Sequence, residues 1–320
     1  MRLPPELLAA IEQETSRFDG KQLARAAADL TERYKKDETR GSSIVNSEVH
    51  RAAYLAVRLP ATYAANRRVF AEIRALAPHL EISSMLDLGA GPGTALFAAA
   101  EAFPHLRQAT LIEADAAWFE VGKRLGGSIP VRTQWLQRDL RSKLDFGPHD
   151  LVVISYALGE IPGSALEPLL ERAWQNATKL LVIVEPGTMR GFSNVNAARS
   201  WLITHGGELV TPCPHHHACP MAAGGDWCHF AQRVERTSLH RALKGGALGH
   251  EDEKFSYVAA GRGFVSLPKA RIVRHPRKHS GHVQLTLCRA EGLGTRTVTK
   301  SQKQAYKEAR KAGWGDAWND

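Results

Sequence analysis

Four cysteines are the residues of this chain best suited to chemistry, and they are unevenly distributed. Cys213, Cys219 and Cys228 lie within one short stretch, and Cys288 ends an apolar segment that is expected to form a strand. Clustered thiolates repel one another unless a cation binds them, and a metal ion or an iron–sulfur cluster both deprotonates and binds such thiols. Three clustered cysteines and one distant cysteine therefore predict a metal or iron–sulfur site that uses all four thiols.

The spacing of the cysteines bears on the kind of metal. Five residues separate Cys213 from Cys219, and eight separate Cys219 from Cys228. Zinc sites mostly use paired cysteines with two residues between them, and that pattern is absent here. A proline follows two of the cysteines, which is common near iron–sulfur ligands. The spacing favours an iron–sulfur cluster, with zinc and free thiols as alternatives; His215–His217 and His229 are candidates for zinc ligands, hydrogen-bond partners or plain polar loop residues.

A second signal lies upstream, in a glycine-rich turn that follows a predicted strand at 85–88 and opens a helix. The three glycines of this turn, within 89–93, let the backbone adopt unusual φ angles and approach a ligand closely. Asp87 precedes the turn. Glu113 ends the second predicted strand, where a carboxylate can accept both hydroxyls of a ribose, and Asp139 ends the third, where adenine contacts are expected.

This arrangement is similar to that of class I S-adenosylmethionine (SAM) methyltransferases rather than to that of NAD enzymes. Pro92 removes a backbone N–H that a pyrophosphate would need, whereas SAM carries no phosphate. A degenerate loop that keeps only the turn is the alternative. No catalytic residue is assigned, because the Asp/Asn-Pro-Pro-aromatic motif of amine-methylating enzymes is absent around Tyr156 and Glu160 at the end of the fourth strand. The predicted SAM-binding residues are Asp87, Gly89, Gly91, Gly93, Glu113 and Asp139.

Regular alternation of strands and helices surrounds these motifs. Predicted strands at 85–88, 109–113, 131–136, 150–155 and 180–185 are separated by helical stretches, which implies a parallel sheet with right-handed crossovers. The predicted fold class is therefore α/β, a Rossmann-like methyltransferase sheet with an N-terminal helical region and an inserted iron–sulfur-binding loop. The predicted domains are a helical region at 1–80, the core at 81–204, the cysteine-rich insertion at 205–254, final core strands at 255–290 and a basic tail at 291–320.

The chain has 320 residues and a net charge of +9, and its positive charge is concentrated near one end. Between Arg233 and Lys311 there are 18 Lys and Arg residues against 6 Asp and Glu, so the rest of the chain is slightly acidic. A basic excess confined to one region indicates a polyanionic partner, with an ordinary solvated surface as the alternative. The predicted nucleic-acid-binding residues are Lys269, Arg271, Arg274, Arg277 and Lys278.

Targeting signals are not evident in the sequence. There is no apolar run of about 18 residues that would predict a transmembrane helix. The N-terminus has early acidic residues and resembles neither a signal peptide nor a transit peptide. Metal-like cysteines fit a reducing compartment, so we expect a cytoplasmic protein with no membrane association.

Together these residues resemble one family, the methyltransferase-like proteins of the small ribosomal subunit, which has bacterial and mitochondrial members. The resemblance extends from Gly41-Ser42-Ser43 to Trp314-Gly315-Asp316, and the cysteine block is its most specific part. It implies a factor that binds the small subunit and its rRNA during assembly or translation, as a monomer away from the ribosome. It also implies a 4Fe–4S cluster held by Cys213, Cys219, Cys228 and Cys288.

Three functions remain open at this point. The first is a ribosome-associated factor with a methyltransferase fold, and the second is an active SAM-dependent rRNA methyltransferase with a structural metal. The third is a redox or iron sensor whose RNA binding requires the cluster. The missing amine-methylation motif favours the first function over the second.

Overall fold

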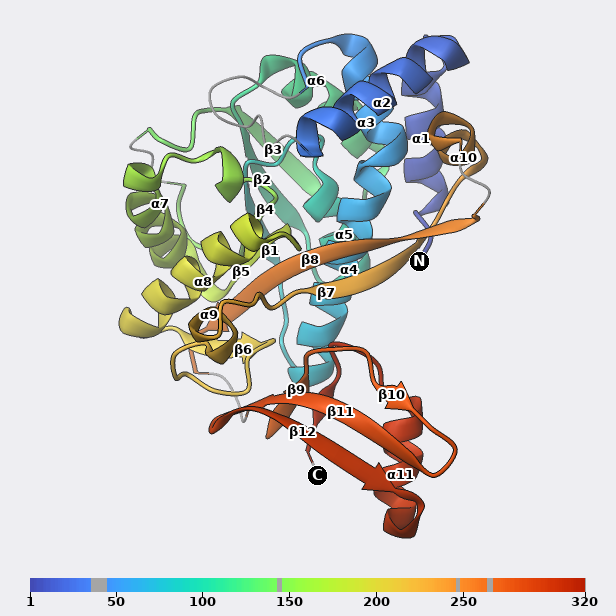
Figure 1. Ribbon diagram of the computed structural model, residues 1–320. Helices are drawn as coiled ribbons and strands as arrows, with labels where there is room; N and C mark the ends of the chain where they lie inside the picture. Colours follow the sequence, from blue (N-terminus) through green and yellow to red (C-terminus); the bar gives the residue numbers. More distant parts are fainter. Residues whose placement is uncertain (36–44, 143–145, 246–247, 264–266, 320) are drawn as a thin grey trace.

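The chain folds around two β-sheets, which occupy opposite ends of the view in Figure 1. The computed structural model describes residues 1–35, 45–142, 146–245, 248–263 and 267–319. The predicted family motif Gly41-Ser42-Ser43 lies outside the described residues. The first sheet has eight strands and the second has five.

Four helices precede the first strand and pack together beside the first sheet (Figure 1). Ser47 caps the third of them by accepting a hydrogen bond from the His50 N–H at 3.2 Å. Pro60 lies in the first turn of the fourth, where a missing N–H costs nothing. None of the described helices is long and apolar enough to cross a membrane. These helices are α1 (Pro5–Thr15), α2 (Gly20–Lys35), α3 (Glu48–Val57) and α4 (Leu59–Leu76).

The first sheet has the strand order β3-β2-β1-β4-β5-β8-β6, and β7 also pairs with β8. Strands β1 to β5 are parallel, and β8 runs antiparallel to β5 and β6, between which it lies. This Rossmann-like sheet confirms the predicted α/β class. Its strands are β1 (Ser84–Leu88), β2 (Gln108–Glu113), β3 (Arg132–Gln137), β4 (His149–Ser155), β5 (Ala177–Pro186), β6 (Glu208–Thr211), β7 (Phe230–Glu235) and β8 (His250–Gly261).

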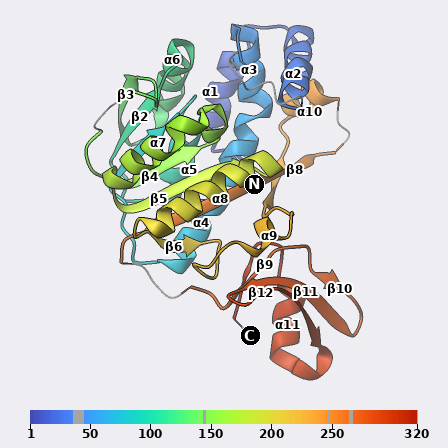
Figure 2. The same cartoon turned by 60° about the vertical axis from the view of Figure 1, so that its left-hand side comes forward.

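Helices cover both faces of this sheet (Figure 2), so its central strands are apolar on both sides. Along β4, Leu151 and Val153 join the core beneath α4 and α5, whereas Val152 and Ile154 join the core beneath α7 and α8. Successive side chains of a strand point to opposite faces, which accounts for this division. The helices are α5 (Thr94–Ala102), α6 (Ala116–Leu125), α7 (Gly163–Asn176), α8 (Met189–Thr204), α9 (Pro220–Ala223) and α10 (Ser238–Lys244), with 3-10 turns η1 (Gly126–Ser128) and η2 (Leu158–Glu160).

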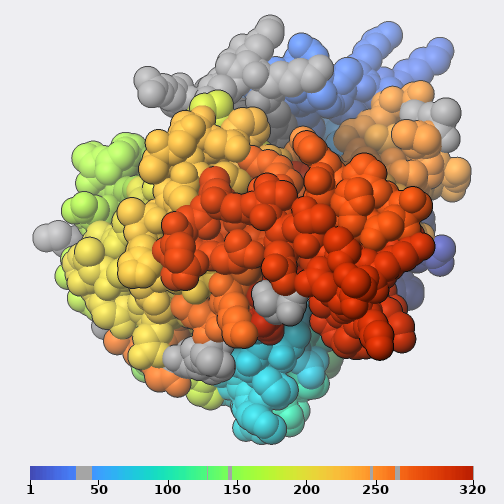
Figure 3. All heavy atoms as spheres, turned by 60° about the horizontal axis from the view of Figure 1, so that its bottom comes forward, coloured from blue at the N-terminus to red at the C-terminus, as the bar shows by residue number. Residues whose placement is uncertain are grey.

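The second sheet is antiparallel and has its own core. Its strand order is β10-β11-β9-β13, and β12 pairs with β11. Val283, Leu285 and Leu287 of β11 pack against Ala309 and Trp318. This unit, orange to red in Figure 3, forms one end of the molecule. It comprises β9 (Ala270–Ile272), β10 (Arg277–Lys278), β11 (His282–Arg289), β12 (Gly292–Thr299), η3 (Lys300–Gln302), α11 (Lys303–Lys311) and β13 (Ala317–Trp318).

Two domain assignments made from the sequence need correction. The prediction that 255–290 completes the core sheet is wrong for β11, which pairs only within the second sheet among the described strands. The prediction of a basic tail at 291–320 is wrong as well, because this stretch supplies β12, α11 and β13. The alternating Val283, Leu285 and Leu287 predict a strand but not its sheet, and β12 buries only Val298, so it lacks an apolar signal.

Candidate metal centre and cofactor loop

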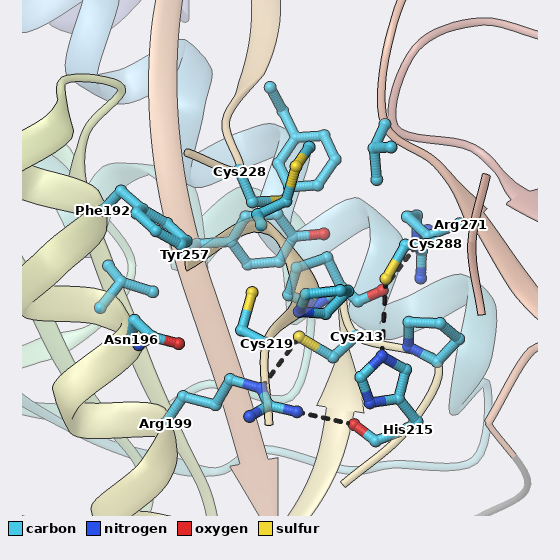
Figure 4. A pocket seen from close by; sticks show the side chains of 17 residues that line it. Phe192, Asn196, Arg199, Cys213, His215, Cys219, Cys228, Tyr257, Arg271 and Cys288 are labelled. Carbon is cyan, nitrogen blue, oxygen red and sulfur yellow. Dashed lines mark hydrogen bonds between the residues drawn. The ribbon is translucent and has the colours of Figure 1, made fainter. Parts of the chain in front are cut away.

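All four cysteines line one cavity of about 40 Å³ (Figure 4). Cys213 follows β6, Cys219 immediately precedes α9, and Cys228 lies just before β7. Cys288 comes from β11 of the second sheet. The thiols therefore meet at the junction of the two sheets, and helix α8 supplies part of the remaining wall.

The thiols interact electrostatically with one another across this cavity. Burial raises the pKa of the Cys228 thiol well above its usual value, and the three other thiols raise it further. Burial and the neighbouring Cys213 and Cys219 raise the pKa of Cys288 to about 12. Without a bound cation the thiols of Cys228 and Cys288 are therefore protonated at neutral pH, and metal binding would release their protons.

A buried arginine approaches the thiols from helix α8. Arg199 is only 4% exposed, and its Nε–H donates a hydrogen bond to Cys213 Sγ at 3.2 Å. Its Nη2 donates to the backbone oxygens of His215 and His217 at 2.9 and 2.8 Å. His215 Nε2 lies 3.5 Å from Cys288 Sγ. Burial dominates the raised pKa of Cys213, and the charge of Arg199 opposes that rise.

Arg199 was not predicted from the sequence, although a weak signal for it exists. Val195 and Leu202 lie four residues before and three residues after it, and both are buried. On a helix these positions share a face, so an arginine between them faces the interior. Sequence spacing does not connect that face with Cys213, because β6 and a cis Thr211–Pro212 bond intervene.

The four thiols line the same cavity together with apolar side chains and two arginines. Among the residues that the structure describes, no three His, Cys, Asp or Glu side chains form a group that could hold a single metal ion. The donor set nevertheless fits an anionic iron–sulfur cluster, because it combines four soft thiol ligands with a guanidinium hydrogen bond and apolar walls.

The predicted cofactor loop forms the expected turn after β1. Gly89 has a φ of +78°, and a Cβ there would lie 2.7 Å from the Cβ of Ala157, so a side chain does not fit. The Gly91 N–H donates to Glu113 Oε2 at 2.7 Å, and the Asp115 N–H donates to Glu113 Oε1 at 2.8 Å. The carboxylate of Glu113 therefore holds the loop against the end of β2.

Carboxylates gather around this loop. Asp87 is 1% exposed, and within the described part of the chain neither of its carboxylate oxygens has a hydrogen-bond partner. Burial, and secondarily Glu113, raise its pKa to about 8. Glu160 and Asp115 lie close enough to Glu113 to interact with it electrostatically. This concentration of negative charge favours a cationic ligand.

Two other residues of this region are engaged by protein groups. Asp139 accepts hydrogen bonds from the Arg141 side chain, with Nε 2.9 Å from both carboxylate oxygens, and these bonds lower its pKa. It is thus drawn toward its own loop. Tyr156 adopts a left-handed φ of 57° at the end of β4, and its hydroxyl donates to Glu253 Oε1 at 3.0 Å. Arg58 also donates to Glu253.

The predicted nucleic-acid-binding residues divide into two groups. Lys269, Arg277 and Lys278 are exposed, whereas Arg274 is half-buried and forms an ion pair with Asp226. Arg271 is 1% exposed, so its predicted role in binding phosphates is wrong. Its guanidinium donates to Pro212 O at 2.7 Å and to Gly315 O at 2.8 Å, and it forms an ion pair with Glu72. Its position on β9 makes it a link between the second sheet and helix α4.

Replacement of Arg271 should destabilise the protein strongly. In Arg271→Met, we expect the free energy of unfolding to fall by about 3–5 kcal/mol, because Glu72 and two carbonyls lose their buried partner. Replacement of the exposed Lys278 by Met, on β10 of the same sheet, should change it by no more than about 0.5 kcal/mol. Urea unfolding of the two variants measures this difference. Equal losses would show that Arg271 does not join the two sheets.

The family follows from a match that covers most of the chain. The sequence model described as mitochondrial small ribosomal subunit Rsm22 matches residues 48–319. The chain belongs to the Rsm22 family. The matched residues include the cofactor loop, all four cysteines and the second sheet.

Curated relatives of this Rsm22 family member are longer proteins. It is 29% identical to the human protein named ribosome assembly protein METTL17, mitochondrial, over 82% of this chain and 61% of the relative. It is 27% identical to Rsm22-cox11 tandem protein 2, mitochondrial, of Schizosaccharomyces pombe, over 82% of this chain and 42% of the relative. The chain thus spans roughly half the length of these relatives.

Solved structures with a partly similar arrangement are methyltransferases. Magnesium protoporphyrin IX methyltransferase of Synechocystis PCC 6803, with bound SAM, matches with a TM-score of 0.41 and 12% identity, over 77% of this chain and 98% of that one. The plantazolicin methyltransferase BpumL matches with a TM-score of 0.38 and 12% identity, over 79% and 99%. The fold class rests on the strand order described above and not on these distant matches.

Proposed function

We propose that this Rsm22 family member is an assembly factor of the small ribosomal subunit that carries a 4Fe–4S cluster and binds rRNA. The observation that carries the proposal is that three thiols from the segment between β6 and β7 and one from β11 line one cavity, in a chain of this family. The family description refers to the small ribosomal subunit, and the human relative is named a ribosome assembly protein. Both support the ribosomal part of the proposal.

The arrangement of the thiols favours a cluster over zinc. Zinc–sulfur bonds of about 2.3 Å bring the four sulfurs of a tetrahedral site to about 3.8 Å from one another. In a 4Fe–4S cluster each cysteine binds a different iron, so its sulfurs lie farther apart. All four thiols line one cavity, and the cysteine pairs with two intervening residues that zinc sites mostly use are absent, which supports a cluster. Cys213, Cys219, Cys228 and Cys288 would hold the cluster.

The second sheet and α11 supply a basic surface for rRNA. Residues 270–318 contain 11 Lys and Arg against 3 Asp and Glu, a net +8 that is nearly all of the chain's +9. Lys303, Lys307 and Lys311 are exposed at successive four-residue intervals on α11, with Arg310 beside them. Like charges at this spacing destabilise a helix by about 0.2–0.5 kcal/mol per pair. An anionic partner that neutralises these lysines would remove this repulsion.

The acidic surroundings of the glycine loop support SAM binding. SAM carries a positively charged sulfonium and an ammonium group, and Asp87 is a buried carboxylate whose oxygens have no partner in the described residues. A Cβ on Gly91 would meet no atom within 4 Å, so the turn is open there, and Glu113 lies at the end of β2, where a ribose would be bound. We infer that SAM occupies this loop.

The variant Asp87→Asn separates stability from SAM binding. Burial raises the pKa of Asp87 from 3.8 to about 8, so the free folded protein binds a proton that the unfolded chain releases, and its stability falls as pH rises between these values. Asn carries no carboxyl group that must be charged inside the protein, so the variant should not lose this stability and should unfold at a higher temperature at pH 8. It should bind SAM about 1–3 kcal/mol more weakly in calorimetry, because the carboxylate is lost. If the variant and the unmodified protein bind SAM with equal affinity, SAM does not bind beside Asp87.

An active rRNA methyltransferase is the second candidate function, and the preserved glycine loop favours it. Tyr156, at the position where such enzymes hold the target base, is instead tied to Glu253 through its hydroxyl. Transfer of a labelled methyl group from SAM to small-subunit particles would establish the activity. Particles that stay unlabelled while SAM binds would favour the assembly factor.

Association with the small subunit tests the main proposal directly. The anaerobically purified protein should co-sediment with immature small-subunit particles, and the bound fraction should decrease as salt increases because rRNA contacts release counterions. Large-subunit particles provide the control, since they also present rRNA. Equal association with both subunits would reduce the proposal to non-specific RNA binding.

A further inference from the structure

Helix α8 places a cation inside the cysteine cavity, and no carboxylate of the described residues pairs with it. Arg199 is 4% exposed, and its hydrogen bonds go to Cys213 Sγ and to two backbone oxygens. Arg271, the other buried guanidinium beside this cavity, is compensated by Glu72. The ion pairs found among the described residues include none to Arg199.

An uncompensated buried charge is costly. Removing a charged group from water costs several kcal/mol, and backbone oxygens offset only part of that cost. A partner with full negative charge must therefore lie close to Arg199 in the working protein. The thiol of Cys213, 3.2 Å from Nε, is the group in position to supply that charge once a metal deprotonates it.

We propose that Arg199 is the counter-ion of the cluster and raises its reduction potential through the hydrogen bond to Cys213. This inference rests on the proposed cluster. Four thiolates around an iron–sulfur core carry net negative charge, and reduction adds one more negative charge. A nearby positive charge and an N–H···S hydrogen bond both stabilise the reduced form more than the oxidised one. Arg199 is thus a positioning and tuning residue and not a ligand.

The contacts of Arg199 also give it a second effect, on retention of the cluster. By holding His215 O and His217 O, the guanidinium orders the segment between Cys213 and Cys219. Lys can keep the charge at this site, but it lacks the planar fork that reaches a sulfur and two carbonyls together. Gln keeps polar atoms but removes the charge.

The test compares Arg199→Gln, Arg199→Lys and the control Arg107→Gln. Arg107 is exposed and bonds to carbonyls of its own loop before β2, so its replacement changes the charge equally but away from the cavity. The midpoint potential is measured by redox titration followed by electron paramagnetic resonance, and iron retention is measured by the rate of iron loss to a chelator. We expect a lower potential and faster iron loss in Arg199→Gln, smaller changes in Arg199→Lys, and none in Arg107→Gln.

The possible results separate the counter-ion role of Arg199 from the presence of the cluster. A potential and an iron-loss rate in Arg199→Gln equal to those of the unmodified protein would overturn the counter-ion role while the cluster itself stands. An equal fall of the midpoint potential in the Gln and Lys variants would also overturn it, because Lys retains the charge. An unmodified protein without iron would instead refute the cluster, and with it the basis of the inference.

Discussion

Replacing Cys288 with Ser should remove most of the iron and loosen the second sheet from the core. In the proposed cluster, β11 contributes Cys288 as a ligand, whereas the other three thiols come from the segment between β6 and β7. Loss of one ligand from a four-thiolate site therefore breaks the covalent connection between the sheets. A metal-bound segment derives much of its stability from the bound metal. Loss of the metal should therefore destabilise the whole segment 213–228.

Iron analysis and amide hydrogen exchange measure these two consequences. In Cys288→Ser, exchange should accelerate in residues 213–228 and at the β9–β13 pairing, where Ile272 N–H donates to Asp316 O at 3.0 Å. Thr286→Ser, two residues earlier on the same strand, is the matched control and should retain both iron and protection. Full iron occupancy in Cys288→Ser would exclude this residue from the site.

Neutralising the exposed cations of α11 should have the largest effect on ribosome binding. We expect replacement of Lys303, Lys307, Arg310 and Lys311 by Gln to weaken association with small-subunit particles by roughly tenfold per lost phosphate contact at about 0.1 M salt. The slope of log affinity against log salt should become shallower by about 0.7–0.9 for each contact. Arg271 and Arg274 are omitted because the protein itself pairs both of them.

A variant of equal charge change controls for non-specific electrostatics. Gln replacements at four exposed cations of the first unit lower the net charge by the same amount, and they should change the salt slope much less. The control residues are Lys21, Arg25, Arg107 and Lys123. If both quadruple variants lose affinity equally, the basic surface of α11 has no special role, and the binding surface must be sought elsewhere.

The sequence predicts the parts of this fold whose signals are local. Apolar strands with a glycine turn identify β1 and its parallel neighbours, because a strand buried on both faces is apolar throughout. The four cysteines stand out by residue type alone. The second sheet is not predicted as a separate sheet because β12 is rich in Gly and Thr with a single buried valine, and β13 is two residues long.

The roles of the arginines depend on distant contacts that no local pattern encodes. In the sequence, Arg271 belongs to a cluster of basic residues. In the structure its partners are Glu72 on α4 and the backbone of Pro212 and Gly315. Arg199 lies 14 residues before the cysteine that it contacts, on a different element. Charge counts identify a basic region, but burial decides which of its residues remain available to a partner.

Iron and acid-labile sulfide analysis of the anaerobically purified protein tests the central claim most directly. We expect a brown protein with about four irons and four sulfides per chain, all lost when the cysteines are replaced by serine. Stoichiometric zinc without iron or sulfide would contradict it, and the four thiols would then belong to a structural zinc site at the junction of the two sheets.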